Sequence, residues 1–171
     1  MSRVRRLFRY AWLVTVGLSA PSAHAQSGPC DAPAFREFDF WLGPWIVTDS
    51  TNAEVGRNEI VSVQRGCVLM EHWTGADGST GSSFNIYDRF AKRWHQTWVD
   101  ANGLLLQLDG NLVNDNMVLG GTRVSPSGAP MRHRITWIPH RDGSVTQHWE
   151  RSADGGRSWI TQFKGMYRRR R

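Results

Sequence analysis

The sequence lacks a long hydrophobic run and motifs for metal, nucleotide or covalent chemistry. Its N-terminal apolar run, Ala11 to Leu18, is far shorter than the roughly 20 residues that span a bilayer as a helix, so we expect no permanent membrane anchor. The six histidines form no H-x-H or H-x-x-x-H pair, and neither cysteine has a neighbouring ligand at metal spacing. No nucleophile elbow and no glycine-rich phosphate loop is present. We therefore expect no metal and no cofactor.

The first 25 residues have the three parts of a secretory signal peptide. Arginines without any acidic residue come first, and the apolar run follows them. Pro21 and Ser22 end the run, and Ala23-His24-Ala25 offers the small-x-small pattern that a signal peptidase accepts. We therefore expect cleavage before Gln26 and a periplasmic or secreted mature protein.

The positive charge lies at the two ends of the chain. The whole chain has 21 basic and 15 acidic residues, a formal charge of +6. Residues 1–25 contain four of the arginines and residues 168–171 another four, so the part between them is slightly acidic. Nucleic-acid binding requires a basic face on the folded domain. We therefore expect this protein not to bind nucleic acid.

Two cysteines, Cys30 and Cys67, remain after the predicted cleavage. An even number of cysteines in an exported protein predicts a disulfide, here between the N-terminal segment and an early strand. Two separate buried thiols are the alternative.

From about residue 45 onward, apolar and polar residues alternate in short runs separated by turn-forming residues, which is typical of an all-β protein. The predicted strands are 45–50, 57–64, 67–74, 82–88, 93–99, 104–110, 116–123, 132–138, 144–151 and 158–167. Residues 33–42 favour a short helix, and no linker divides the single domain expected at 26–167, before a basic tail at 168–171. Ten hairpin-linked strands leave unpaired edges unless the sheet closes. We therefore predict an antiparallel up-and-down β-barrel, with a two-sheet sandwich as the alternative.

Four motifs resemble those of a family of secreted bacterial proteins without an assigned activity. The first, Phe38 to Trp45, resembles its F-D-F-W-L-G-x-W start, with Pro44 in place of the usual polar residue. The others are Ser83 to Asp88 (S-F-N-x-Y-D), Trp94 to Asp100 (W-x-Q-x-W-x-D) and Gln147 to Trp159 (Q-x-W-E-x-S-x-D-G-G-x-x-W). The resemblance implies a lipocalin-like (calycin-like) barrel and no particular activity.

Two shorter motifs concern structural residues. Gly43-x-Trp45 resembles the lipocalin G-x-W, whose tryptophan closes the barrel base under an arginine of the last strand. This resemblance implies that Arg168 stacks on Trp45. Ser152 to Trp159 is similar to the Asp-box of sialidase-type propellers. The resemblance implies that the Asp154 carboxylate bonds the amides of the turn and that the Trp159 ring packs beneath it. A single copy indicates a turn, not sugar cleavage.

Three predicted strands place a polar side chain between large apolar ones on the same face, because side chains at i, i+2 and i+4 point the same way. The triplets are Leu69-Glu71-Trp73, Trp94-Gln96-Trp98 and Val145-Gln147-Trp149. We expect these faces to point into the barrel, where each polar group needs a partner. Apolar and aromatic walls with a few converging polar groups are typical of ligand pockets, so we predict a site for a small, largely apolar molecule. The residues predicted to line it are Glu71, Trp73, Trp94, Gln96, Trp98, Gln147 and Trp149.

Two other interpretations stay open. The eight tryptophans after residue 25 could fill the lumen, with the inward polar groups bonded to one another, to Arg134 or to Tyr87; the barrel would then be a structural or interaction module of the cell envelope. Alternatively, burial would raise the pKa of Glu71 and make it the acid or base of a small enzyme. Binding without catalysis is favoured.

The histidines contribute little to the predicted pocket. The same alternation turns His72, His95 and His148 outward, and His133 and His140 are expected near turns. A haem-binding barrel would need an inward histidine, so this register argues against haem.

Overall fold

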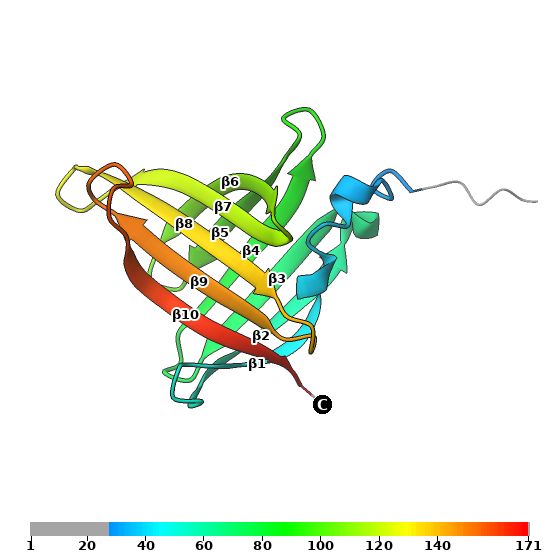
Figure 1. Ribbon diagram of the computed structural model, residues 1–171, viewed down its shortest axis with the longest axis horizontal. Helices are drawn as coiled ribbons and strands as arrows, with labels where there is room; N and C mark the ends of the chain where they lie inside the picture. Colours follow the sequence, from blue (N-terminus) through cyan, green and yellow to red (C-terminus); the bar gives the residue numbers. More distant parts are fainter. Residues whose placement is uncertain (1–27, 171) are drawn as a thin grey trace, which may run out of the picture.

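Ten antiparallel strands follow one another along the chain and close into a barrel in the computed structural model, which describes residues 28–170 (Figure 1). The strands are β1 (Gly43–Thr48), β2 (Glu54–Val63), β3 (Val68–Gly75), β4 (Thr80–Asp88), β5 (Arg93–Asp100), β6 (Leu105–Val113), β7 (Asn116–Val124), β8 (Pro130–Pro139), β9 (Val145–Ser152) and β10 (Ile160–Arg169). All ten predicted strands are confirmed, although several ends differ by up to 3 residues. The predicted signal peptide, residues 1–25, lies outside the described residues, as does Arg171 of the predicted tail.

Pairing of the first and last strands closes the sheet. β1 lies antiparallel to β10, with Trp45 opposite Arg169 and Val47 opposite Tyr167. Every other pair joins strands that are neighbours in the sequence. The up-and-down barrel is therefore confirmed, and the two-sheet sandwich is wrong.

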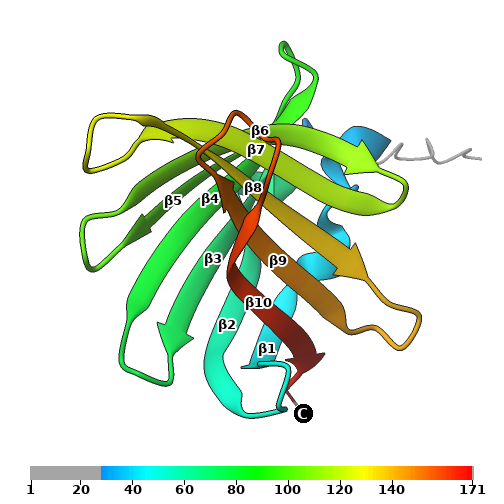
Figure 2. The ribbon, with the colours of Figure 1, turned by 60° about the vertical axis from the view of Figure 1, so that its left-hand side comes forward.

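The segment before β1 covers one end of the barrel (Figures 1 and 2). The short helix predicted within 33–42 takes the form of two 3-10 turns, η1 (Pro33–Phe35) and η2 (Asp39–Trp41). A 3-10 turn brings side chains at i and i+3 above one another. Phe38 and Trp41 have this spacing, and their rings stack with 5.0 Å between the centroids.

Phe38 is the centre of an aromatic cluster that fills this end of the lumen. Its ring centroid lies 5.0 Å from that of Trp137 and 5.6 Å from that of Trp94, both edge-on. These side chains and Trp41 are fully buried. Aromatic pairs of this geometry contribute about 0.5–1.5 kcal/mol each beyond the area that they bury. The covering segment is thus part of the core.

A disulfide between Cys30 and Cys67 anchors this segment. Cys67 directly follows η3 (Gln64–Gly66), the turn that joins β2 to β3. The Arg36 guanidinium donates a hydrogen bond to the Gly66 carbonyl of the same turn. The predicted disulfide is confirmed, and the alternative of two separate thiols is wrong.

The arginine that stacks on Trp45 is Arg169, not Arg168 as predicted. The guanidinium carbon of Arg169 lies 4.0 Å from the centre of the Trp45 ring. Side chains alternate along β10, so Arg169 lies on the same face as the buried Tyr167, whereas Arg168 lies on the opposite face and donates to Thr48 Oγ1. The prediction chose the correct strand for the arginine but a residue on the wrong face of that strand.

Glycine at position 43 of the G-x-W motif is required by the backbone conformation and by the nearby Arg169. Gly43 has a φ of +120°, which a side chain rarely adopts. A Cβ atom there would also collide with the Arg169 guanidinium, which donates to the carbonyl of the preceding Leu42. Gly43 therefore leaves room for the arginine that covers Trp45.

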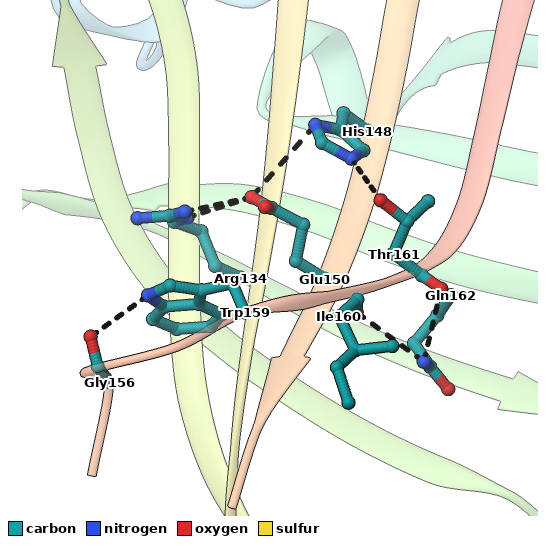
Figure 3. A network of polar contacts seen from close by, with 8 residues as sticks. All are labelled: Arg134, His148, Glu150, Gly156, Trp159, Ile160, Thr161 and Gln162. Carbon is teal, nitrogen blue, oxygen red and sulfur yellow. Dashed lines mark hydrogen bonds and ion pairs between the residues drawn. The ribbon is translucent and has the colours of Figure 1, made fainter. Parts of the chain in front are cut away.

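The turn between β9 and β10 is the predicted Asp-box turn. The Asp154 carboxylate accepts hydrogen bonds from the backbone N–H groups of Arg157 and Ser158, each at 2.9 Å. The Trp159 indole donates to the Gly156 carbonyl and stacks on Arg134, whose guanidinium carbon lies 4.1 Å from the ring centre (Figure 3). The box forms a turn on the outside of the barrel, away from the lumen.

Candidate ligand pocket

The three predicted inward stripes do face the lumen. Leu69, Glu71, Trp94, Gln96 and Val145 are at most 3% exposed. They come from β3, β5 and β9, no two of which are neighbours in the sheet, so the stripes meet across the interior. The alternation of the sequence therefore predicted the inner faces correctly.

The histidines between these residues point outward, as predicted. His72 is exposed. His95 Nδ1 lies 2.9 Å from an Asp109 carboxylate oxygen on the neighbouring strand β6. His148 Nε2 lies 2.9 Å from Thr161 Oγ1 on β10 (Figure 3). None of these three rings contributes to the lumen.

A cavity of about 530 Å³ lies in the lumen on the side away from the aromatic cluster. It is partly open to solvent, and its walls include six of the seven residues predicted to bind a ligand: Glu71, Trp73, Gln96, Trp98, Gln147 and Trp149. The other lining residues are Glu54, Val55, Ala76, Asp77, Ser79, Leu106, Ile135, Gln162, Phe163 and Tyr167. Side chains thus fill the lumen only at the end under the N-terminal segment, and the other end is open.

Trp94 is the predicted pocket residue that does not line the cavity. Its indole packs against Phe38 in the aromatic cluster and donates to a Glu37 carboxylate oxygen at 3.2 Å. Trp94 comes near the start of β5 and Trp98 four residues later, so the two share a face at different heights in the barrel. Alternation predicts the face of a side chain, but not its height.

Polar side chains form a hydrogen-bonded belt at the base of the cavity, with Glu71 at its centre. One Glu71 carboxylate oxygen accepts from Asn58 Nδ2 and the other from Ser83 Oγ, both at 2.6 Å. Gln96 Nε2 donates to Asn85 Oδ1 at 2.9 Å, and Asn85 Nδ2 donates to Ser83 Oγ at the same distance. The belt fixes the orientation of each side chain by pairing it with another.

Tyr167 extends this belt to the opposite wall. Its hydroxyl donates to Gln147 Oε1 and lies 3.4 Å from Asn58 Nδ2. The belt therefore runs from β4 and β5 through β3 and β2 to β10 and β9, across the seam between the first and last strands. It separates the open cavity from the closed aromatic end.

Burial changes the acidity of this belt. It raises the pKa of Glu71 to about 7, because the lumen solvates a carboxylate less well than water, and the hydrogen bonds from Ser83 and Asn58 oppose the shift only in part. Burial also raises the pKa of Tyr167 well above its usual value, and the nearby Glu71 carboxylate adds to this. Glu71 can therefore gain or lose a proton near neutral pH, as groups at functional sites often do.

Two glycines make room for the indole rings of the wall. A Cβ atom on Gly81 of β4 would collide with the Trp98 ring, which lies across this residue from the neighbouring strand. A Cβ atom on Gly56 of β2 would lie 2.6 Å from the ring of Trp73 on β3. Both rings thus lie against the backbone of the adjacent strand, and the space in front of them stays open.

Two further contacts hold the aromatic wall. The Trp73 ring meets the Phe163 ring edge-on, at 5.8 Å between the centroids. The Trp149 indole donates to His133 Nδ1 at 3.1 Å. His133 was expected near a turn but lies within β8 and is buried, and burial with the nearby Arg123 and Arg151 lowers its pKa. His133 is therefore neutral, and its Nδ1 accepts the hydrogen bond from the indole N–H and orients Trp149.

The two alternative partners proposed for the inward polar groups lie elsewhere. Arg134 points to the outside of the barrel and donates to the Glu150 carboxylate at 2.8 Å (Figure 3). Tyr87 packs against Phe35 near the closed end, with 5.2 Å between the ring centroids. Glu71 instead accepts hydrogen bonds from Asn58 and Ser83, which the sequence did not indicate as its partners.

These missed residues are inward positions of β2 and β4. Asn58 lies two residues before the buried Ile60, and Ser83 and Asn85 alternate with the exposed Phe84. Over residues 83–85 the polar side chains point inward and Phe84 points outward, the reverse of the usual pattern. Ser83 and Asn85 do fall in the S-F-N-x-Y-D motif, but their place beside Glu71 follows only from the register, in which Glu71 lies opposite Ser83.

The described residues contain neither a metal site nor a membrane-spanning helix. Within 28–170, no group of three or more His, Cys, Asp or Glu side chains could hold a metal ion. No helix in this part of the chain is long and apolar enough to cross a membrane. Comparison of the sequence with protein-family models and with curated proteins found no match.

Proposed function

We propose that this protein is an exported barrel that binds a small, largely apolar molecule in its open cavity. The observation that carries the proposal is the cavity of about 530 Å³ with Trp73, Trp98 and Trp149 on its wall and Glu71 at its base. Ligand pockets in proteins are typically 300–1,000 Å³ in volume, mostly apolar, with a few polar groups that orient the ligand.

The rigidity of the pocket supports the same proposal. The indole rings are held by the backbone of neighbouring strands and by His133, and the polar belt fixes the base. A preformed site loses less conformational entropy when the ligand binds. The closed end supplies stability while the open end remains available for binding.

The lipocalin resemblance and the disulfide support an exported carrier. Trp45 covered by an arginine of the last strand is the arrangement that the resemblance implies, with Arg169 in that role. Disulfides such as Cys30–Cys67 persist in oxidising compartments, consistent with the signal peptide predicted at residues 1–25. We therefore propose a periplasmic or secreted location.

Titration with N-phenyl-1-naphthylamine, an uncharged aromatic probe that brightens in apolar surroundings, tests the binding proposal. We expect saturable binding with a Kd in the micromolar range, accompanied by a change in tryptophan emission. Probe fluorescence that rises only linearly with concentration would contradict it.

A matched pair of variants locates the binding site. Leu106 lines the cavity, and its neighbour Leu105 is half exposed on the outer face of β6. Leu106→Trp fills the cavity and is expected to weaken probe binding at least tenfold, whereas Leu105→Trp adds the same ring outside and leaves binding unchanged. Equal effects of the two variants would place the probe elsewhere.

A second candidate function is acid–base catalysis on the bound molecule. It is favoured by a specific observation, the Glu71 carboxyl at the base of the cavity with a pKa raised to about 7. A general acid or base works best when its pKa is close to the working pH. Loss of turnover in Glu71→Gln with retained binding would support this function, and absence of turnover with every bound ligand would remove it.

A further inference from the structure

The cavity has an uneven distribution of charge. Three carboxylates, Glu54, Glu71 and Asp77, are among the residues that line it. No lysine, arginine or histidine is among these lining residues of the described chain. Electrostatic complementarity disfavours an anionic ligand in such a pocket and favours a cationic one.

Glu71 lacks the cationic partner that other acidic side chains of this barrel have. On the surface, Glu54 pairs with Arg57 at 2.9 Å and Glu150 with Arg134 at 2.8 Å. Glu71 is only 3% exposed, and within residues 28–170 its hydrogen-bond partners are the neutral Asn58 and Ser83. A buried carboxylate is costly unless an opposite charge accompanies it.

The base of the cavity also has acceptors to spare. Asn58 Oδ1 is buried without a hydrogen-bond partner. Gln96 donates through its Nε2 to Asn85, which leaves its carbonyl oxygen for another donor. An ammonium group has three donors and no acceptor, so it complements a site of this kind.

The aromatic wall suits the same group. Trp73, Trp98, Trp149 and Phe163 line the cavity above Glu71. The faces of aromatic rings attract cations, tryptophan most strongly, and several rings together recognise ammonium ligands. The rings also provide the apolar surface for the rest of the ligand.

We infer that the pocket selects ligands with a protonated amine on an apolar body, held with the ammonium group at the Glu71 carboxylate. This inference rests on the proposed binding function and specifies its ligand class. Binding of the amine supplies the missing counter-charge, and the apolar body lies along the indole rings. Fatty acids and other anions are excluded by the same carboxylates.

Three ligands with the same chain and different head groups test the inference: octylamine, 1-octanol and octanoate. The affinity of each is measured at pH 8 by competition with bound N-phenyl-1-naphthylamine. We expect octylamine to bind at least tenfold more tightly than 1-octanol, and octanoate to bind most weakly. Equal or tighter binding of the alcohol or the acid would overturn the inference, with the binding function intact. Failure of the probe itself to bind would overturn the proposed function.

Glu71→Gln and its matched control identify the group that confers the preference. Gln keeps the shape of the side chain and removes its charge, so octylamine and 1-octanol are expected to bind this variant with similar affinity. Glu59→Gln makes the same change on the exposed outer face of β2 and is expected to keep the preference. An amine preference that persists in a folded Glu71→Gln protein would overturn the role of Glu71.

The pH dependence on the wild-type protein gives an independent measurement. Of the groups packed against Glu71, Asn58 on β2 and Ser83 on β4 do not titrate, and Tyr167 on β10 stays protonated because its pKa is raised. With a pKa of about 7 for Glu71, the affinity for octylamine is expected to rise about 100-fold from pH 5 to pH 8, as the carboxylate forms. The affinity for 1-octanol should not rise. A flat profile for the amine would contradict the inference.

Discussion

Arg169 and Trp45 face each other across the seam that closes the barrel. They are register partners in β1 and β10, and the guanidinium carbon lies 4.0 Å from the ring centre. Trp45 in turn donates from its indole nitrogen to the Trp41 carbonyl at 2.8 Å. One pair of residues thus joins the last strand, the first strand and the segment that covers the closed end.

Arg169→Ala is therefore expected to lower the free energy of unfolding by about 1–3 kcal/mol. The change removes the cation–π contact and the hydrogen bond to the Leu42 carbonyl. Arg168→Ala, which removes an arginine on the opposite face of β10 without a contact to Trp45, is expected to change stability by less than about 0.5 kcal/mol. Urea denaturation of the two variants measures both effects. A larger loss in Arg168→Ala than in Arg169→Ala would contradict the assignment.

The disulfide is expected to contribute substantially to stability. Cys30 and Cys67 are 37 residues apart, and closing a loop of this length lowers the entropy of the unfolded chain by an amount worth about 4 kcal/mol. The Cys30→Ser/Cys67→Ser double variant should unfold at correspondingly lower urea concentration. The reduced wild-type protein serves as the control, since it should behave in the same way. Unchanged stability in both would show that the segment is held by the aromatic cluster alone.

Glu71 should make stability depend on pH. Its folded-state pKa of about 7 lies above the 4.5 of an ordinary glutamate, so the folded protein binds an extra proton between these values. The contribution of this group is fully present below pH 4.5 and is lost as the pH rises through 7. At about 1.4 kcal/mol per pH unit, the loss amounts to about 3 kcal/mol.

Glu71→Gln isolates this contribution from that of the other carboxyls. The stability of the variant relative to the wild type is expected to increase by about 3 kcal/mol from pH 4.5 to pH 8, because the glutamine stays uncharged. Urea denaturation at a series of pH values measures the difference. Glu59→Gln, exposed on β2, should show no such trend. A constant difference between Glu71→Gln and the wild type would mean that Glu71 titrates normally.

Much of the barrel and part of the pocket follow from alternation in the sequence. Glu71, Gln96 and Gln147 were predicted to face inward because large apolar residues flank them at i±2, and all three line the cavity. Alternation does not give the height of a residue in the barrel, which depends on strand stagger. For this reason Trp94 was predicted in the pocket, although it belongs to the closed end.

Contacts between residues of different strands were harder to predict. Asn58 is the partner of Glu71 because β2 lies next to β3 in a particular register, and a short polar residue in a strand gives no sign of this from its own neighbours. The stacking arginine was misplaced by one residue because the lipocalin resemblance names a strand end but no register. Burial of Tyr167 decides the choice, because side chains two residues apart share a face.

Gly81 tests whether the space in front of Trp98 belongs to the binding site. Gly81→Ala places a methyl group where the Trp98 ring lies, with the Val99 carbonyl oxygen also only 3.0 Å away, so we expect the ring to move toward the cavity. Overpacking of this kind destabilises proteins by about 1–3 kcal/mol. Because the displaced indole also takes up cavity volume, binding of N-phenyl-1-naphthylamine should weaken as well.

Gly120→Ala is the matched control for this change. Gly120 lies in β7, and a Cβ atom there meets its nearest neighbour, the His133 carbonyl, at an ordinary 3.4 Å. The control should therefore lose less stability and keep its affinity for the probe, measured by urea denaturation and probe titration. If Gly81→Ala binds the probe as tightly as Gly120→Ala, the Trp98 ring does not limit the space available to the ligand. Weaker binding in Gly81→Ala alone would place the ligand against Trp98.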